Sequence, residues 1–300
     1  MKTHSRLPVI IALFQTVQFA TMGIWVRMMQ ESFTTYQQVY IRILIASILG
    51  WVIFAKVIKP RQIMKYSAQQ HLTYLLRAVF VFGVGVLLFT VAIQKTEFAT
   101  VSFIASLPTL GIFAWLIFRE RLDKGSLVYV LISIIGLALL TGINFTNFHL
   151  GVGETAAVIS MVGFNIGYLL SRKHPASSNK YQDAVIVLSY GWIVPFLAVL
   201  AAGKGLWPQH ITTVAWVGLI ASVITNISGM VMVNYIFAHM KAYIAGNIFL
   251  LEGVIALVIG IFLYSETPSW QAIVGAMIIV ACAYMVAKRD RGGRTIAGED

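Results

Sequence analysis

Long runs of apolar residues, separated by short polar segments, dominate the chain. Ten runs reach the roughly 20 residues that an α-helix needs to cross the hydrocarbon core of a bilayer. The predicted helices are Leu7–Trp25, Tyr36–Ile58, Leu72–Ile93, Ala99–Phe118, Ser126–Ile143, Gly153–Ser171, Ala184–Ala202, Thr213–Ala238, Tyr243–Tyr264 and Trp270–Ala287. Strands of a membrane barrel alternate over only about 10 residues. The pattern therefore predicts an all-α integral membrane protein with ten transmembrane helices.

The distribution of Lys and Arg among the connecting segments predicts the orientation of the helices. If the amino terminus is inside, the outside segments contain only Arg27, Lys95 and Lys204, and every other basic residue outside the apolar runs lies inside. Because cytoplasmic loops carry an excess of basic residues, we expect a multi-pass protein of the cell (inner or plasma) membrane with both termini cytoplasmic. If the chain had one transmembrane helix more or one fewer, a basic loop would lie on the outside of the membrane.

Composition agrees with a membrane protein and excludes several other classes. Hydrophobic residues make up 59% of the 300 residues and charged residues 11%, whereas a soluble domain has about 25% charged residues. The formal net charge of +11 is divided among short loops, so we expect no nucleic-acid partner. Cys282 is the one cysteine, and no Cys and His spacing typical of a metal site occurs. We therefore expect no metal and no cofactor.

Two stretches, residues 97–140 and 243–286, share an order of features that indicates an internal repeat. Each has a long apolar helix, then an acidic turn, then a further helix that contains a glycine. The acidic residues are Glu120 and Glu266, and the glycines are Gly136 and Gly275. The alternative is that apolar helices resemble one another through composition alone.

Five helices in the first half place the start of the second half on the opposite side of the membrane, so the repeats are predicted to be inverted. We expect a first five-helix repeat over residues 1–146, a second, inverted repeat over residues 147–288 and a cytoplasmic tail over residues 289–300. Inverted repeats recur in secondary transporters, which bind their substrate near the midplane between the repeats.

The residues of the repeat resemble the EamA family of the drug/metabolite transporter superfamily. Residues 99–122 form an Ala- and Ser-rich helix with Pro108 in the middle and FRERL at its end, and the second copy reads LLEGVIALVIGIFLYSE. Gly253 stands where the family commonly has proline, and Arg42 matches a frequent arginine early in the second helix. The resemblance implies a central cavity, alternating access and usually export of metabolites, amino acids or drugs, although some members take up nutrients.

Three charged residues lie well away from the ends of the apolar runs, where a charge is costly and indicates function by default. Glu252, near the middle of the ninth helix, either receives a coupling proton, binds an amine, or is a structural group that pairs with an arginine or is protonated and hydrogen-bonded. Arg42 and Arg77 are charge partners of a carboxylate substrate or of Glu252, or else they extend toward the membrane interfaces.

Polar side chains at helical spacing predict the faces that surround the cavity. Gln15, Gln18 and Trp25 share a face of the first helix, and such a face either lines a cavity or bonds a neighbouring helix. The complete set of candidate substrate-binding or cavity-lining residues is Gln15, Gln18, Trp25, Ser102, Ser106, Asn165, Tyr168, Asn226, Asn234, Asn247 and Glu252.

These features predict a secondary transporter that moves a small metabolite, amino acid or drug-like compound by alternating access, in the direction of export. An uptake carrier of the same fold and a channel or lipid scramblase stay open as alternatives. The six histidines lie in loops or termini and no helix face pairs two carboxylates, so we do not expect an enzyme. The expected partners are a small-molecule substrate, the lipid bilayer and, for coupling, protons; a monomer and a homodimer are both open.

Overall fold

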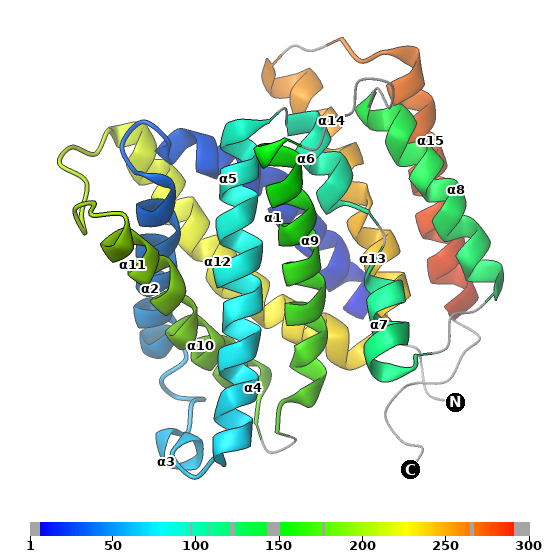
Figure 1. The fold of residues 1–300 in the computed structure, drawn as a ribbon. Helices are drawn as coiled ribbons and strands as arrows, with labels where there is room; N and C mark the ends of the chain where they lie inside the picture. Colours follow the sequence, from blue (N-terminus) through cyan, green and yellow to red (C-terminus); the bar gives the residue numbers. More distant parts are fainter. Residues whose placement is uncertain are drawn as a thin grey trace.

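The computed structural model describes residues 7–96, 98–107, 109–120, 124–142, 151–175, 178–264 and 267–290. Every regular element in these ranges is a helix, and none of them contains a strand. Eight helical spans are long and apolar enough to cross a membrane, and two shorter apolar helices, Phe103–Phe118 and Leu127–Thr141, accompany them. Figure 1 shows the helices standing side by side in one upright bundle.

The first half of the chain contributes the elements up to α8. In chain order they are α1 (Leu7–Met29), α2 (Thr35–Ile53), α3 (Pro60–Ile63), α4 (Ala68–Ala78), η1 (Val79–Val86), α5 (Leu87–Lys95), α6 (Phe98–Ala105), α7 (Leu110–Phe118) and α8 (Lys124–Thr141). The segment η1 is a π-helix that joins α4 and α5 into one long span.

The second half of the chain contributes the remaining elements. Its elements are α9 (Val152–Leu169), η3 (Leu170–Lys173), α10 (Lys180–Gly191), α11 (Ile193–Ala201), α12 (Thr213–His239), α13 (Ala242–Phe249), α14 (Leu251–Tyr264) and α15 (Trp270–Asp290). The predicted Ile143, the Glu266 of the second acidic turn and residues 291–300 of the predicted tail lie outside the described residues.

Polar first turns shift several helix starts away from the boundaries that apolar runs predict. The third span begins at Ala68, before the predicted Leu72, because Ser67 accepts a hydrogen bond from the backbone of Gln70 and the Gln70 side chain accepts one from the backbone of Ser67. This capping box satisfies backbone donors that the first turn leaves free. The search for apolar runs misses a turn of this kind.

The seventh span shows the same effect, and the second helix ends early. Asn179 caps α10, so this helix begins at Lys180 rather than at the predicted Ala184. The second helix was predicted to reach Ile58 but ends at Ile53, because the apolar residues that follow form turns.

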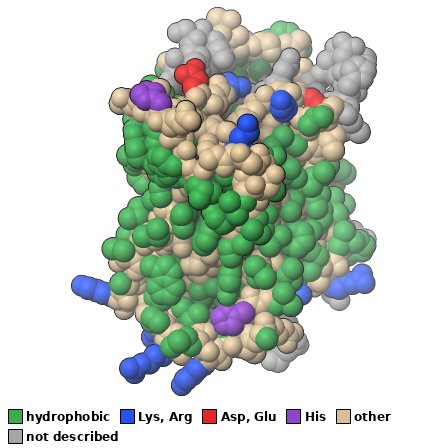
Figure 2. Space-filling view, turned by 60° about the vertical axis from the view of Figure 1, so that its left-hand side comes forward, with side chains coloured by type: hydrophobic (Ala, Val, Ile, Leu, Met, Phe, Trp, Pro, Cys, Tyr) green, Lys and Arg blue, Asp and Glu red, His purple; other side chains and the backbone are tan. Residues whose placement is uncertain are grey.

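The outer surface of the bundle is apolar in the middle and charged at the two ends. Figure 2 shows hydrophobic side chains over the middle of one face, with Lys and Arg side chains above and below and Asp and Glu side chains above. On this outer surface Val52 is 68% exposed and Ile224 is 59% exposed. Many large apolar side chains are exposed on this surface, which is favourable in contact with lipid and unfavourable in contact with water.

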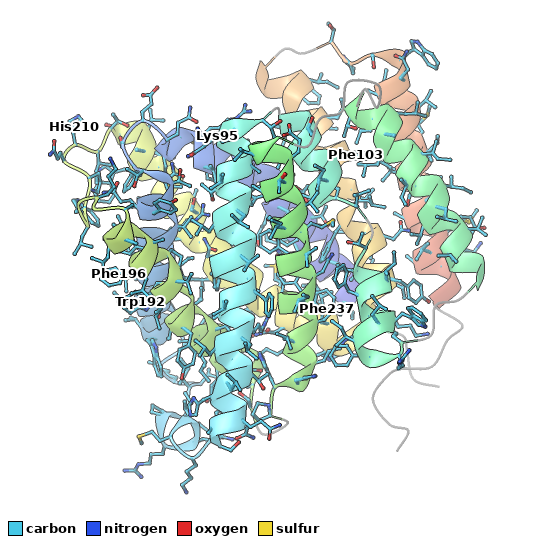
Figure 3. The ribbon with its side chains drawn as sticks, in the orientation of Figure 1. Lys95, Phe103, Trp192, Phe196, His210 and Phe237 are labelled. Carbon is cyan, nitrogen blue, oxygen red and sulfur yellow. The ribbon has the colours of Figure 1, made fainter. Side chains whose placement is uncertain are left out.

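Connections alternate between the two ends of the bundle. Figure 1 shows α3 and the ends of α7 and α15 at one end, and Figure 3 shows Lys95 and His210 at the other. The alternation agrees with the predicted path of the chain. Which end faces the cytoplasm stays a prediction from the basic residues.

The contacts between helices follow the two halves of the chain. The first helix of one half packs along the third span of the other, α1 on α12 and α9 on η1 and α5. The second spans pack on each other, α2 on α10 and α11, and so do the fifth, α8 on α15. Two equivalent halves related by a twofold axis produce this pattern, so the two-repeat architecture is confirmed.

Gly136 and Gly275, the glycines of the sequence repeat, lie face to face where α8 meets α15. A Cβ on Gly275 would overlap the carbonyl oxygen of Gly136 and lie 2.5 Å from the backbone nitrogen of Leu140. A Cβ on Gly136 would lie 2.8 Å from Cγ2 of Ile278. Backbone atoms cannot move aside as flexible side chains do, so this helix contact requires glycine.

Candidate functional site

Two helices are interrupted near their middles, at corresponding places in the two halves. The fourth span stops at Ala105 and resumes at Leu110, and the ninth stops at Phe249 and resumes at Leu251. Pro108, the residue expected to interrupt the fourth helix, lies outside the described residues. Interrupted backbone inside a bilayer is tolerated where protein or a water-filled cavity covers it.

Both interruptions border one central cavity. Its volume, taken as the space open to the centre of a water-sized sphere, is about 130 Å³. The wall includes Ser106 and Leu107 from the first interruption, and Phe249 and Glu252 from the second. The cavity therefore lies where the two halves of the chain meet, with room for a small organic molecule or several waters.

The structure brings seven of the predicted residues together on the wall of this cavity. They are Gln15, Ser106, Asn165, Tyr168, Asn226, Glu252 and the charge partner Arg42. Nδ2 of Asn165 donates to Oγ1 of Thr109 at 2.6 Å and so ties α9 to the first interruption. By contrast, Oε1 of Gln15 and Oγ of Ser106 are buried without a hydrogen-bond partner in the part of the chain that the structure describes.

Four of the other predicted residues lie away from the cavity wall. Nε2 of Gln18 donates to Oγ of Ser228 on α12 at 2.7 Å, and Nδ2 of Asn234 donates to the carbonyl oxygen of Lys180 at 2.8 Å. Asn247 is completely buried within α13. Trp25 is half-buried, and its carbonyl oxygen lies against Gly218 of α12.

The structure places Ser102 on α6, but its side chain is not among those described. Arg77, the other charge partner, lies near one end of the bundle and not on the cavity wall.

Aromatic rings make up much of the cavity wall, and sequence analysis missed most of them. Phe19 stacks on Tyr168 with ring centroids 6.2 Å apart, and Phe164 stacks on Tyr168 at 5.6 Å. Phe19 also meets the edge of Phe249 at 5.3 Å. A phenylalanine within an apolar run looks like any lipid-facing residue. The spacing of four between Phe164 and Tyr168 was the one sequence signal for a shared face.

Arg42 and Glu252 are the charged residues on the described wall of the cavity. Arg42 is 0% exposed; its Nη2 donates to Oγ1 of Thr90 at 3.2 Å, while Nε and Nη1 have no hydrogen-bond partner among the described residues. Glu252 lies in the first turn of α14. No ion pair within 4.0 Å joins Glu252 to either arginine. The structural pairing that the sequence left open is therefore not formed.

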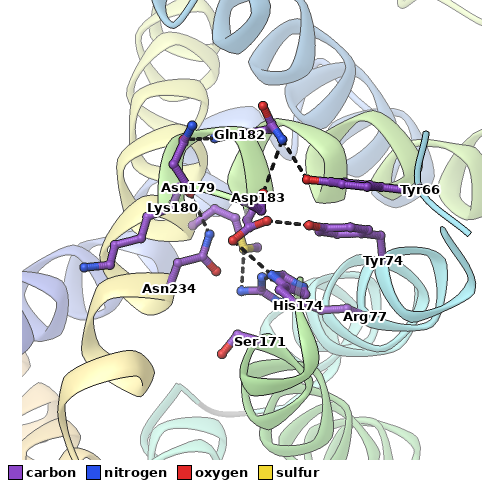
Figure 4. A network of polar contacts seen from close by, with 12 residues as sticks. Tyr66, Tyr74, Arg77, Ser171, His174, Asn179, Lys180, Gln182, Asp183 and Asn234 are labelled. Carbon is purple, nitrogen blue, oxygen red and sulfur yellow. Dashed lines mark hydrogen bonds and ion pairs between the residues drawn. The ribbon is translucent and has the colours of Figure 1, made fainter. Parts of the chain in front are cut away.

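A second polar cluster lies near one end of the bundle, where α4, α9, α10 and α12 meet (Figure 4). The Tyr74 hydroxyl donates to Asp183, and Nδ1 of His174 lies 3.4 Å from Oδ2 of the same carboxylate. Arg77 donates from Nε to the carbonyl oxygen of Gly167 at 3.1 Å, and its Nη1 lies 3.4 Å from Nε2 of His174. Burial lowers the pKa of His174, which lies in the loop between two spans.

Glu120 of the first acidic turn connects the two halves at the same end of the bundle. Its carboxylate pairs with Arg172 and accepts a hydrogen bond from the backbone nitrogen of Ala242 at 3.0 Å. Arg172 also donates to the carbonyl oxygen of Met240 at 3.2 Å. Glu120 and Arg172 together therefore connect the end of α7 to the segment between α12 and α13.

Comparison with solved structures supports the fold. Among 29 matching chains, one crystal structure of a protein without a stated function superposes with a TM-score of 0.76 at 15% sequence identity. The match covers 95% of this chain and 99% of that one. At this identity the likeness shows the fold alone.

Sequence comparisons identify the family. No curated protein sequence matches this chain. The sequence model of the EamA-like transporter family matches residues 6–142 and again residues 151–288, which together are nearly the whole chain. Members of this family are transporters of small solutes and not enzymes. The chain therefore belongs to the EamA-like transporter family of the drug/metabolite transporter superfamily and is a multi-pass membrane protein.

Proposed function

We propose that this protein is a secondary transporter that moves a small metabolite, amino acid or drug-like compound through its central cavity, which opens alternately to the two sides of the membrane. The observation that carries the proposal is that the two interrupted helices, one from each matched half, border the same cavity. Interrupted helices at a repeat interface are where secondary transporters bind substrate. The transport direction that we propose is export from the cytoplasm.

The composition of the wall supports a small organic solute. Rings of Phe19, Phe164, Tyr168 and Phe249 supply apolar surface, and a few polar groups fix orientation. Binding sites for small molecules combine these two features. The basic residues of the loops support a location in the inner or plasma membrane with both termini in the cytoplasm.

Glu252 is the group that we propose for proton coupling. Its side chain borders the cavity in the first turn of α14 and forms no ion pair with the described residues. A carboxyl group in a cavity that is wet from one side and then from the other exchanges its proton with each side in turn.

The test is solute flux in proteoliposomes that contain the purified full-length protein. A panel of labelled amino acids, amines, nucleobases and organic acids is measured with and without a pH gradient. We expect saturable flux of at least one compound, faster when unlabelled compound is present on the opposite side. Such counterflow is a property of a carrier and not of a channel. The proposal fails if no compound moves under any gradient, or if flux occurs without counterflow.

The variant Glu252→Gln tests the coupling. We expect it to retain counterflow but to lose the effect of the pH gradient. Glu31→Gln is the matched control, since Glu31 is exposed in the loop after α1. If Glu252→Gln responds to the gradient as the control does, Glu252 does not couple protons, and the carrier proposal stands without it.

A further inference from the structure

Arg42 has far fewer partners than a guanidinium can use. A guanidinium has five N–H groups, and the relative exposure of Arg42 is 0%. The single hydrogen bond joins Nη2 to the hydroxyl of Thr90, which itself donates to the carbonyl oxygen of Val86. Nε and Nη1 are buried and have no partner among the described residues.

Within the part of the chain that the structure describes, no carboxylate forms an ion pair with Arg42. No Asp or Glu within the described residues lies within 4.0 Å of it. The side chain does not reach an interface either, because none of it is exposed. An unpaired buried cation costs several kcal/mol. A position that bears this cost and borders a cavity indicates a group whose partner comes from outside the chain.

The remainder of the wall limits what that partner is. A guanidinium is an effective partner for an oxyanion such as a carboxylate or phosphate. The wall that contains Arg42 also contains the rings of Phe82 and Phe89, and further rings line the same space. Glu252 on the same wall repels a second negative charge on a ligand when it is ionised. These features together favour a monoanion with an apolar body over a phosphate ester.

We infer that Arg42 is the anion-binding residue of the cavity and that the solute carries a carboxylate attached to an apolar, ring-sized body. The inference rests on the proposed transport through this cavity, and it adds the chemical class of the solute. Glu252 stays free to hold a proton while the carboxylate of the solute is at Arg42.

The experiment compares probes of one shape and different charge on the purified full-length protein in detergent. The probes are 3-phenylpropanoate, L-phenylalanine, 3-phenylpropylamine and phenyl phosphate, with affinity measured by thermal shift and by competition. We expect the two carboxylates to bind, the amine not to bind, and phenyl phosphate to bind more weakly than 3-phenylpropanoate. A preference for the amine or for the phosphate would overturn the assignment, and so would the absence of binding by both carboxylates.

Variants of Arg42 separate a binding role from a structural role. Arg42→Gln should weaken the affinity for 3-phenylpropanoate by about 10- to 100-fold, which is the loss expected for a charge-assisted hydrogen bond. Arg42→Lys should restore part of this affinity. Arg61→Gln, on the exposed helix α3, is the matched control and should bind as wild type does. Without ligand, Arg42→Gln should melt at or above the wild-type temperature, because it removes an unpaired charge.

Two results would contradict this part of the inference. If Arg42→Gln lowers the melting temperature without ligand as much as Arg77→Gln does, Arg42 is structural. If Arg42→Gln and Arg61→Gln bind 3-phenylpropanoate equally, Arg42 does not bind the anion. In both cases counterflow of another solute would still uphold the proposed transport, so the two proposals fail separately.

Discussion

Arg42 and Arg77 are both completely buried in the same bundle, yet their surroundings differ. Arg77 contacts Gly167, His174 and Met230, and His174 links it to the carboxylate of Asp183. Arg42 hydrogen-bonds only Thr90 among the residues that the structure describes. The same residue type thus has two kinds of surroundings: near one end of the bundle it is bonded to neighbouring helices, and at the cavity two of its nitrogens have no partner among the described residues.

The two regions also differ in packing. Around Arg77, α4, α9, α10 and α12 meet through side chains of which most bond one another, while Nδ1 of His174 and Oδ1 of Asn234 have no hydrogen-bond partner among the described residues. Around Arg42, the wall leaves a space of about 130 Å³ and several polar atoms without partners. A region whose groups satisfy each other supports stability, and one whose groups are unsatisfied supports binding. This contrast is open to direct tests.

The largest effect on stability is expected from Asp183→Ala. Removing this carboxylate takes away the acceptor of the Tyr74 hydroxyl and the ion-pair partner of His174, to which Arg77 is joined, and breaking a buried charged cluster costs about 3–5 kcal/mol. Unfolding in SDS and thermal melting both measure the change. Asp183→Asn keeps an acceptor and should lose less. A cost below about 1 kcal/mol for Asp183→Ala would mean that the cluster does not hold the helices together.

A matched pair of glycine substitutions tests the packing contrast. A Cβ on Gly167, beside Arg77, would lie 3.1 Å from the backbone nitrogen of Val81, so Gly167→Ala should cost about 1–3 kcal/mol. A Cβ on Gly229, on the cavity wall, would lie 3.3 Å from the movable Nε2 of Gln15. Gly229→Ala should therefore be neutral, or up to about 1 kcal/mol stabilising through helix propensity. If the two variants lose equal unfolding free energy, the helices around Arg77 and those around the cavity do not differ in packing.

The smallest effect is expected from the titration of His174. Burial lowers its pKa, so the folded protein keeps this imidazole neutral where the unfolded chain is protonated, beside Arg77, Asp183 and Tyr74. Stability should therefore fall as pH decreases through and below the ordinary range of histidine. The melting temperature of His174→Gln should fall less than that of wild type between pH 7.5 and pH 5.5. Parallel curves for the two proteins would show that His174 takes no part.

The sequence predicts the order of the apolar helices well because lipid imposes a simple composition on each span, although eight of the described helical spans, and not ten, are long enough to cross a membrane. It locates helix starts poorly where polar caps such as Ser67 or Asn179 add a first turn. Along α1, Gln15 and Gln18 are three residues apart and so differ by about 60° around the helix. That rotation directs Gln15 to the cavity and Gln18 to α12.

Partners from distant segments are beyond the reach of a single sequence. The sequence around Arg42 resembles the sequence around Arg77, because each is a lone arginine within an apolar run. The difference between them depends on Asp183 and His174, which approach one arginine and not the other only after the two halves pack. Glu252 was identified because a carboxylate in an apolar run is conspicuous, whereas the phenylalanines of the wall were hidden by the apolar residues around them.

The most direct test of the account asks whether the cavity opens to both sides of the membrane. Ser106 borders the cavity with an unpartnered hydroxyl, so Ser106→Cys in a Cys282→Ala background places a single thiol there. A membrane-impermeant maleimide is then added to either side of sealed vesicles of known orientation, after transport activity has been verified. We predict labelling of the thiol from each side, slowed by transported solute. Labelling from one side only, under every solute and pH gradient, would contradict transport through this cavity.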